Sequence, residues 1–62
     1  MLFEQYDEIL STEEACEALK IGMNSLYQLL QSGMLKGYRN GGVWRIPKES
    51  IIVYIRGQLG LH

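Results

Sequence analysis

The side chains that most often carry enzyme chemistry are scarce in this chain. Its 62 residues include one histidine and one cysteine. His62 is the last residue, and chain ends are usually poorly ordered. Cys16 lies close to Glu14 and Glu17, whose negative charges raise the pKa of a thiol and so do not activate it. We expect Cys16 to be a small packing residue and the protein not to be an enzyme.

The charged residues of the same segment do not form a metal or catalytic motif either. Glu13 and Glu17 lie four residues apart, but Lys20 follows them, which is typical of a solvated helix face. The sequence contains no zinc-ligand spacing, no phosphate-binding P-loop and no dinucleotide fingerprint. We therefore predict no cofactor, no metal site and no small-molecule ligand.

Amide side chains with helical spacing offer a different chemistry, the reading of DNA bases. Leu26, Leu29 and Leu30 form an apolar stripe that predicts a helix over residues 23–32. If this stripe faces inward, three amides face outward with Tyr27 beside them, namely Asn24, Gln28 and Gln31. Asn and Gln can donate and accept two hydrogen bonds with adenine N7 and N6 in the major groove. We predict that this helix reads bases.

Backbone and hydroxyl groups in the same segment can hold phosphate. The backbone N–H groups of residues 22–24 lie at a helix N-terminus, which attracts anions. The hydroxyls of Ser25 and Tyr27 can donate to phosphate oxygens. Tyr27 can equally be a half-buried aromatic residue of the core.

A period of two between residues 36 and 46, interrupted by Asn40 and two glycines, predicts a β-hairpin. We expect a three-residue loop, which places Tyr38 opposite Trp44 and Arg39 opposite Val43. This register puts Trp44 in the core and Arg39 on the other face. A two-residue loop would move Arg39 onto the Trp44 face, which we consider a worse arrangement for a small core.

The two arginines of the hairpin are candidates for DNA contact. Arg39, near the tip, can enter a narrow minor groove, whose negative potential attracts guanidinium groups, or it is a solvated surface charge. Arg45 either contacts phosphate or pairs with Glu49, and the sequence leaves both open. The candidate DNA-binding residues are Met23, Asn24, Ser25, Tyr27, Gln28, Arg39, Asn40 and Arg45.

The charges of the chain are distributed unevenly. The first 17 residues hold six acids and no base, whereas the remainder holds all six bases and only Glu49 as an acid. Such asymmetry is typical of a basic part that meets an anionic partner, although chance clustering produces it too. It agrees with double-stranded DNA as the partner.

Three helices and the hairpin must position these residues. Ser11 and Glu14 form a capping box, so a helix begins there and ends near Lys20. The next helix, over residues 23–32, ends before Gly33, and Pro47 suits the first turn of a third helix. The β-branched run at residues 51–53 makes a strand the alternative for that last segment.

The size and composition of the chain predict one domain. We expect residues 1–62 to form it, with an acidic arm at residues 1–9 and a frayed tail at residues 57–62. The longest apolar run, residues 51–55, is far shorter than the roughly 18 residues of a membrane span. With no signal-peptide pattern and a lone cysteine, we expect a cytoplasmic protein without a membrane partner.

Two sequence motifs carry a resemblance to a known family. The first is the capped segment Leu-Ser-Thr-Glu-Glu-Ala at residues 10–15, followed by Ile-Gly-Met-Asn-Ser-Leu-Tyr at residues 21–27. The second is Trp-Arg-Ile-Pro at residues 44–47. Together they resemble the small winged helix-turn-helix modules of excisionases, which are relatives of the MerR-type regulators. Gly22 departs from the usual Ser cap and Gln28 from a common Arg.

The resemblance implies an α+β fold with two helices, a β-hairpin wing and a C-terminal helix. It further implies sequence-specific binding of double-stranded DNA, with the second helix in the major groove and the wing on the backbone or in the minor groove. We expect an excisionase-like architectural factor of a mobile element or prophage, with an integrase or recombinase as a possible partner. The alternatives are a small transcriptional regulator of the same fold and, less favoured, a protein-interaction module.

Overall fold

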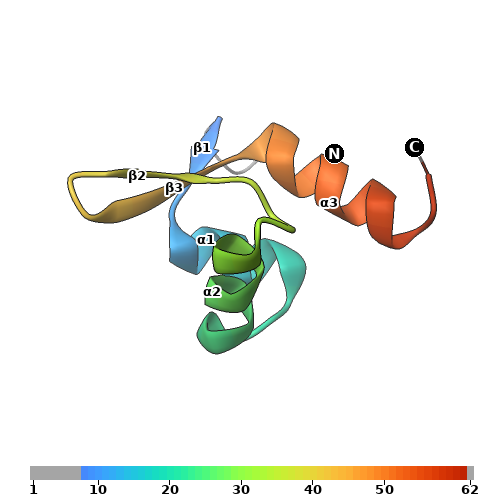
Figure 1. Ribbon diagram of the computed structural model, residues 1–62, viewed down its shortest axis with the longest axis horizontal. Coiled ribbons are helices and arrows are strands. Elements are labelled where there is room, and N and C mark those ends of the chain that lie inside the picture. Colours follow the sequence, from blue (N-terminus) through green and yellow to red (C-terminus); the bar gives the residue numbers. More distant parts are fainter. Residues whose placement is uncertain (1–7, 62) are drawn as a thin grey trace.

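The computed structural model describes residues 8–61 and contains three helices and a small antiparallel sheet (Figure 1). The strand order is β1-β3-β2, so β3 lies between the other two strands. This is the α+β architecture of a small winged helix-turn-helix, as the sequence predicts. In chain order the elements are β1 (Ile9–Leu10), α1 (Thr12–Leu19), α2 (Met23–Ser32), β2 (Tyr38–Asn40), β3 (Val43–Pro47) and α3 (Lys48–Gln58).

The start of α1 is the predicted capping box. The backbone N–H of Glu14 donates to Ser11 Oγ at 3.2 Å, and Glu14 Oε1 accepts from the backbone N–H of Ser11 at 3.0 Å. The helix ends at Leu19, and its C-cap is Lys20, whose backbone is left-handed with φ 58°. Only a short turn therefore separates α1 from α2, and the two helices pack against each other as in a helix-turn-helix.

The second helix begins and ends where its sequence indicates. Gly22 precedes it, and Gly33 closes it with φ 82°, a left-handed conformation that glycine adopts without strain. The backbone N–H of Gly33 donates to the carbonyl of Leu30 at 3.3 Å. The predicted bounds, residues 23–32, are confirmed.

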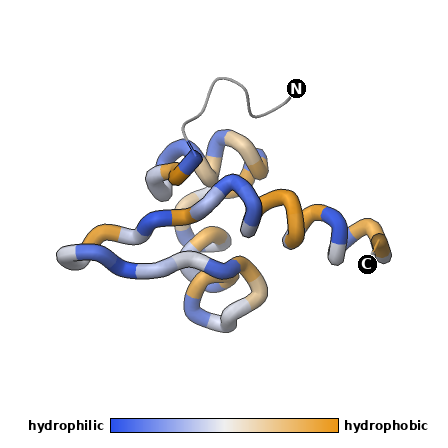
Figure 2. Tube along the Cα trace, turned by 90° about the horizontal axis from the view of Figure 1, so that it is seen from above, coloured by the Kyte–Doolittle hydropathy of each residue, from blue (hydrophilic) through white to orange (hydrophobic). Residues whose placement is uncertain are grey.

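The core lies where the helices meet the sheet. Every element except β2 contributes at least one buried residue, and Leu35 joins them from the turn after α2. All three residues of β2 are exposed, and Figure 2 shows the hairpin reaching out from the body. The hairpin therefore projects from the core as a wing does. The buried residues are Leu10, Ala15, Leu26, Leu30, Leu35, Ile46 and Ile51.

The segment after β3 is a helix and not a strand. It follows Pro47 directly, and the backbone N–H of Lys48 donates to the carbonyl of Glu8 at 2.9 Å. Helix α3 includes Gly57, which we assigned to a frayed tail, and Ile9 pairs with Pro47 in β1, although we assigned it to the N-terminal arm. The rest of that arm, apart from Glu8, lies outside the described residues.

Candidate nucleic-acid interface

The solvent face of α2 carries the predicted amides. Leu26 and Leu30 are buried, and Asn24, Gln28 and Gln31 are exposed on the opposite side of the helix. A helix of this length with an uncovered polar side fits the width of the major groove. The structure thus places the two predicted base-reading side chains, Asn24 and Gln28, on one accessible ridge.

The start of α2 is open as well. Gly22 is the N-cap and supplies no side-chain hydrogen bond, which leaves the first backbone N–H groups to solvent or an anion. Ser25 is exposed in this first turn. Met23 is 37% exposed, and its Sδ accepts a hydrogen bond from Cys16 Sγ at 3.8 Å. Met23 therefore contacts α1 from the edge of the ridge.

The hairpin has a register different from the one we expect from the sequence. Arg39 pairs with Trp44 and Tyr38 with Arg45, so the loop consists of Gly41 and Gly42 alone. The three-residue loop is wrong. Both glycines have positive φ, 64° and 83°, which is the backbone of a type I′ turn, and the twist of that turn matches the twist of paired strands.

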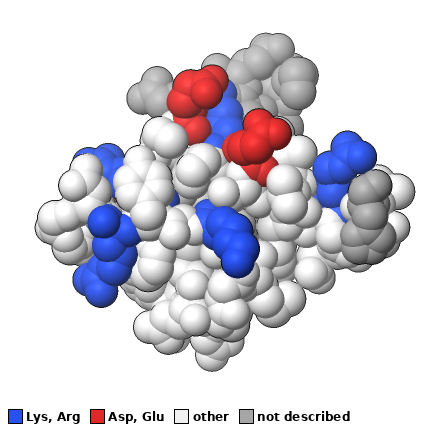
Figure 3. Space-filling model, turned by 45° about the horizontal axis from the view of Figure 1, so that its top comes forward, with Lys and Arg blue, Asp and Glu red and all other residues white. Residues whose placement is uncertain are grey.

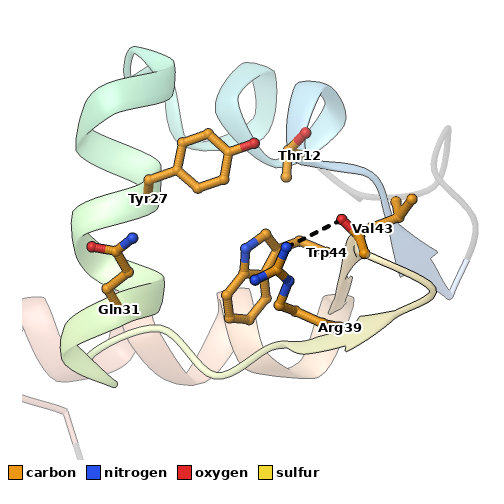
Figure 4. Close-up of a pocket in the computed structure, with 7 residues that line it drawn as sticks. Thr12, Tyr27, Gln31, Arg39, Val43 and Trp44 are labelled. Atoms are coloured by element: carbon orange, nitrogen blue, oxygen red, sulfur yellow. Dashed lines mark hydrogen bonds between the residues drawn. The ribbon is translucent and has the colours of Figure 1, made fainter.

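The corrected register puts Arg39 on the same side of the hairpin as Trp44. The guanidinium carbon of Arg39 lies 5.8 Å from the centroid of the Trp44 ring, and its Nη2 donates to the carbonyl of Gly42 at 3.5 Å (Figure 4). A guanidinium over an indole gains a cation–π attraction. This contact stabilises the two-residue loop, which we considered the worse arrangement because it places Arg39 on the Trp44 face. Arg45, also exposed, lies beside Tyr38 and alternates with Trp44 along β3.

Trp44 is partly buried, whereas Tyr27 is exposed. Trp44 is half-buried and packs against the core, and one of its faces carries Arg39. Tyr27 is 37% exposed and projects from α2 toward Thr12 at the start of α1 (Figure 4). Tyr27 is thus open to a ligand, and it is not among the described residues that pack against the core.

A groove of about 480 Å³ separates α2 from the hairpin. Among the candidates from the sequence it brings together Tyr27 and Arg39, whereas Asn24 and Gln28 lie outside its lining. Thr12 is a lining residue that sequence reasoning missed, and Gln31, expected to face outward, was not among the candidate DNA-binding residues. Gln31 is one helical turn beyond Tyr27 on the outward side of α2, whereas nothing local marks Thr12. The lining residues are Thr12, Tyr27, Gln31, Arg39, Gly42, Val43 and Trp44.

The face of the molecule that Figure 3 shows carries mostly positive side chains. In Figure 3 Lys and Arg side chains are spread across the visible face, and the acidic side chains lie together near its top. The groove lining contains Arg39 and no acid. A face of this kind attracts a polyanion.

The thiol of Cys16 is not activated. Burial raises the pKa of the Cys16 thiol, and the charge of Glu13 raises it further. The predicted direction is correct, although Glu13 contributes the charge and not the two glutamates nearest in sequence. Within residues 8–61, no cluster of three or more His, Cys, Asp or Glu residues is placed to hold a metal ion. None of the described helices is long and apolar enough to span a membrane.

Comparison with known proteins agrees with this geometry. Residues 9–59 match the family model described as a helix-turn-helix domain. The chain is also similar to a protein of Streptomyces ambofaciens named excisionase, with 30% identity over 53 residues that cover 86% of each chain. No solved structure matches the chain significantly. The family match extends from β1 to the end of α3 and so includes the wing together with both helices of the motif, and we conclude that this chain belongs to the helix-turn-helix domain family of DNA-binding modules.

Proposed function

We propose that this protein binds double-stranded DNA with sequence preference, with α2 in the major groove and the β2–β3 hairpin on the backbone or in the adjacent minor groove. One observation carries the proposal. The uncapped, amide-bearing ridge of α2 stands beside a hairpin that bears two exposed arginines, with a groove between them. Base reading and phosphate contact need these two kinds of surface side by side.

The residues of α2 take two roles in this proposal. Asn24 and Gln28 make hydrogen bonds to base edges, because their amides can satisfy both donor and acceptor of adenine. Ser25, Tyr27 and the backbone N–H of Met23 hold phosphate oxygens and fix the depth of the helix in the groove.

The hairpin supplies the charge. Arg39 and Asn40 lie next to the glycine turn, and Arg45 lies on the opposite face of β3 from Trp44. The exposed Arg45 contacts the DNA phosphate backbone and so holds the wing in place without reading the base sequence.

We propose further that the biological role is that of an excisionase-like architectural factor of a mobile element or prophage. The support is the similarity to the Streptomyces protein named excisionase over most of both chains. Such a factor bends DNA and favours excision by an integrase or recombinase, which would be the protein partner.

Fluorescence anisotropy on a mixed-sequence duplex tests the DNA-binding proposal. If about four Lys or Arg side chains contact phosphates, the logarithm of the affinity should fall linearly with the logarithm of the salt concentration, with a slope of roughly −3.6. A slope near zero contradicts the proposal.

The excisionase role has its own experiment. Adding the protein to an integrase reaction should raise the yield of excised circle, and a circularly permuted set of fragments should show bending. If the protein binds DNA but neither bends it nor changes the yield of excision, the transcriptional-regulator alternative is indicated.

A further inference from the structure

We infer that the groove between α2 and the hairpin is the seat of one DNA backbone phosphate, and that Trp44 is a positioning residue that aims Arg39 at that phosphate. The inference rests on the proposed function and deepens it. It adds Thr12, Gln31 and Trp44 to the binding surface.

The groove offers the donors that a phosphodiester requires. The hydroxyls of Thr12 and Tyr27 and the amide of Gln31 come from two helices, and the guanidinium of Arg39 comes from the wing. Arg39 is the one formal charge in the lining. Neutral donors around one guanidinium are the set from which proteins build phosphate contacts.

The position of the groove in the fold also favours a DNA backbone phosphate as its ligand. With α2 in the DNA major groove, the DNA strand that borders it passes over the protein groove between α2 and the hairpin before it reaches the wing. Tyr27 and Gln31 lie on the side of α2 that faces the hairpin, and Asn24 and Gln28 are outside the lining (Figure 4). The groove is thus set between the base-reading ridge and the arginine-bearing wing, where backbone and not base passes.

Trp44 has a function here beyond packing. An exposed arginine usually samples many rotamers, and ordering it on a phosphate costs conformational entropy. The Trp44 ring and the carbonyl of Gly42 hold the guanidinium over the groove before DNA arrives. One of the five guanidinium N–H donors is used on that carbonyl, and a phosphate can accept from two others.

Arg39→Gln is the first variant of the test, with Arg56→Gln as the matched control. Arg56 is an exposed arginine on α3, outside the groove. On a mixed-sequence duplex, Arg39→Gln should make the salt slope shallower by about 0.9, and Arg56→Gln should leave it unchanged. An unchanged slope for Arg39→Gln, while the parent still binds with a steep slope, overturns the phosphate seat and leaves DNA binding intact. A flat slope for the parent would instead contradict the proposed function.

The hydroxyl in the groove is tested by Tyr27→Phe against Tyr38→Phe. Both tyrosines are exposed, at 37% and 49%, and only Tyr27 lines the groove. Loss of one hydrogen bond should weaken duplex binding roughly threefold to tenfold for Tyr27→Phe and not for Tyr38→Phe. Equal effects would remove Tyr27 from the seat.

The positioning role of Trp44 is tested by non-additivity. Trp44→Leu should weaken binding in the parent and have little further effect in the Arg39→Gln background, because the indole acts through the guanidinium. Trp44→Phe, which keeps an aromatic face, should restore most of the affinity. Should Trp44→Leu fail to fold by circular dichroism, Trp44→Met, which also removes the aromatic face, takes its place in both backgrounds. Additive losses in both backgrounds contradict the positioning role.

Trp44 is the only tryptophan of the chain and reports on the groove directly. Its emission should change when duplex is added. Inorganic phosphate added at constant ionic strength should leave it unchanged, because a free anion lacks the flanking contacts of a strand. A saturable change with inorganic phosphate would assign the groove to a free anion and overturn the DNA backbone as its ligand.

Discussion

Gly37 passes so close to Leu30 that a Cβ atom added to the glycine would lie 3.0 Å from Leu30 Cδ2 and 3.1 Å from the carbonyl oxygen of Arg45. Leu30 belongs to the core of α2, and Arg45 belongs to the wing. The absence of a side chain at Gly37 thus sets how closely the hairpin can approach the second helix. The spacing of the two proposed DNA-contacting elements depends on this contact.

Gly37→Ala should therefore destabilise the protein. Both close neighbours are held in place, one by the core and one by the backbone of the central strand, so overpacking of about 1–3 kcal/mol is expected. For a domain of this size about 1 kcal/mol corresponds to roughly 4–8 °C in Tm, which a thermal melt can measure.

Gly57→Ala is the matched control for that substitution. Gly57 lies within α3, and an added Cβ would meet no atom within 4 Å. Alanine should stabilise this position by about 0.4–1 kcal/mol. If both substitutions lower Tm equally, the close packing at Gly37 does not limit the wing.

Ser11→Ala should remove the cap of α1. The backbone N–H of Glu14 loses its acceptor at 3.2 Å, and the expected loss of unfolding free energy is about 1 kcal/mol. Urea unfolding measures the change. Ser25→Ala serves as the control, because Ser25 is exposed within α2 and alanine is the better helix former there. A Ser11→Ala variant as stable as the parent would contradict the role of the capping box.

Arg39→Ala should lower stability slightly as well as weaken DNA binding. The loss of the contact with the Trp44 ring at 5.8 Å should cost about 0.5–1 kcal/mol of unfolding free energy. Arg45→Ala, one residue along β3 from Trp44, should change stability by less than about 0.5 kcal/mol. Chemical denaturation of the two variants, side by side, distinguishes the observed register from the three-residue loop, for which both changes would be equally small.

Asn24→Ala and Gln28→Ala should separate base reading from backbone contact. Each should cost about 1–3 kcal/mol of binding free energy on the preferred site and little on random DNA, because both side chains are exposed and outside the core. Selection of the preferred site from a random library followed by anisotropy provides the measurement. Equal losses on both DNAs would make these amides positioning groups.

The reactivity of Cys16 should be low at neutral pH. Burial and the charge of Glu13 raise the pKa of the thiol, so the reactive thiolate is populated only at higher pH than for a free cysteine. The rate of alkylation by iodoacetamide should therefore rise at a more alkaline pH than in the denatured protein, and Glu13→Gln should shift this rise toward lower pH. A rate profile identical to that of the denatured chain would contradict the raised pKa.

The helices were predictable because their signals are local. Ser11 and Glu14 cap α1 through residues three apart, and Gly33 closes α2 by its own backbone conformation. Pro47 marked the start of α3 even though the β-branched run after it favoured a strand. The segment is helical in the structure, and its residue Ile51 is buried in the core.

The register of the hairpin and the groove were not predictable in the same way. Whether Asn40 belongs to the loop or to β2 depends on the twist of the turn and on the attraction between Arg39 and Trp44. The alternation of apolar and polar residues in the sequence indicates neither of them. Thr12 reaches the groove because α1 begins beside the hairpin. Such a position follows from tertiary packing and has no local sequence pattern.

The place of β2 at the sheet edge divides the molecule into two levels of stability. It pairs with β3 on one side, and its three residues, Tyr38–Asn40, contribute nothing to the buried core. Opening β2 therefore exposes little apolar surface, so its amides can exchange hydrogen through local opening while those of α2 await global unfolding. The wing can adapt its shape to a curved or widened duplex, at a free-energy cost set by three strand residues and not by the whole fold.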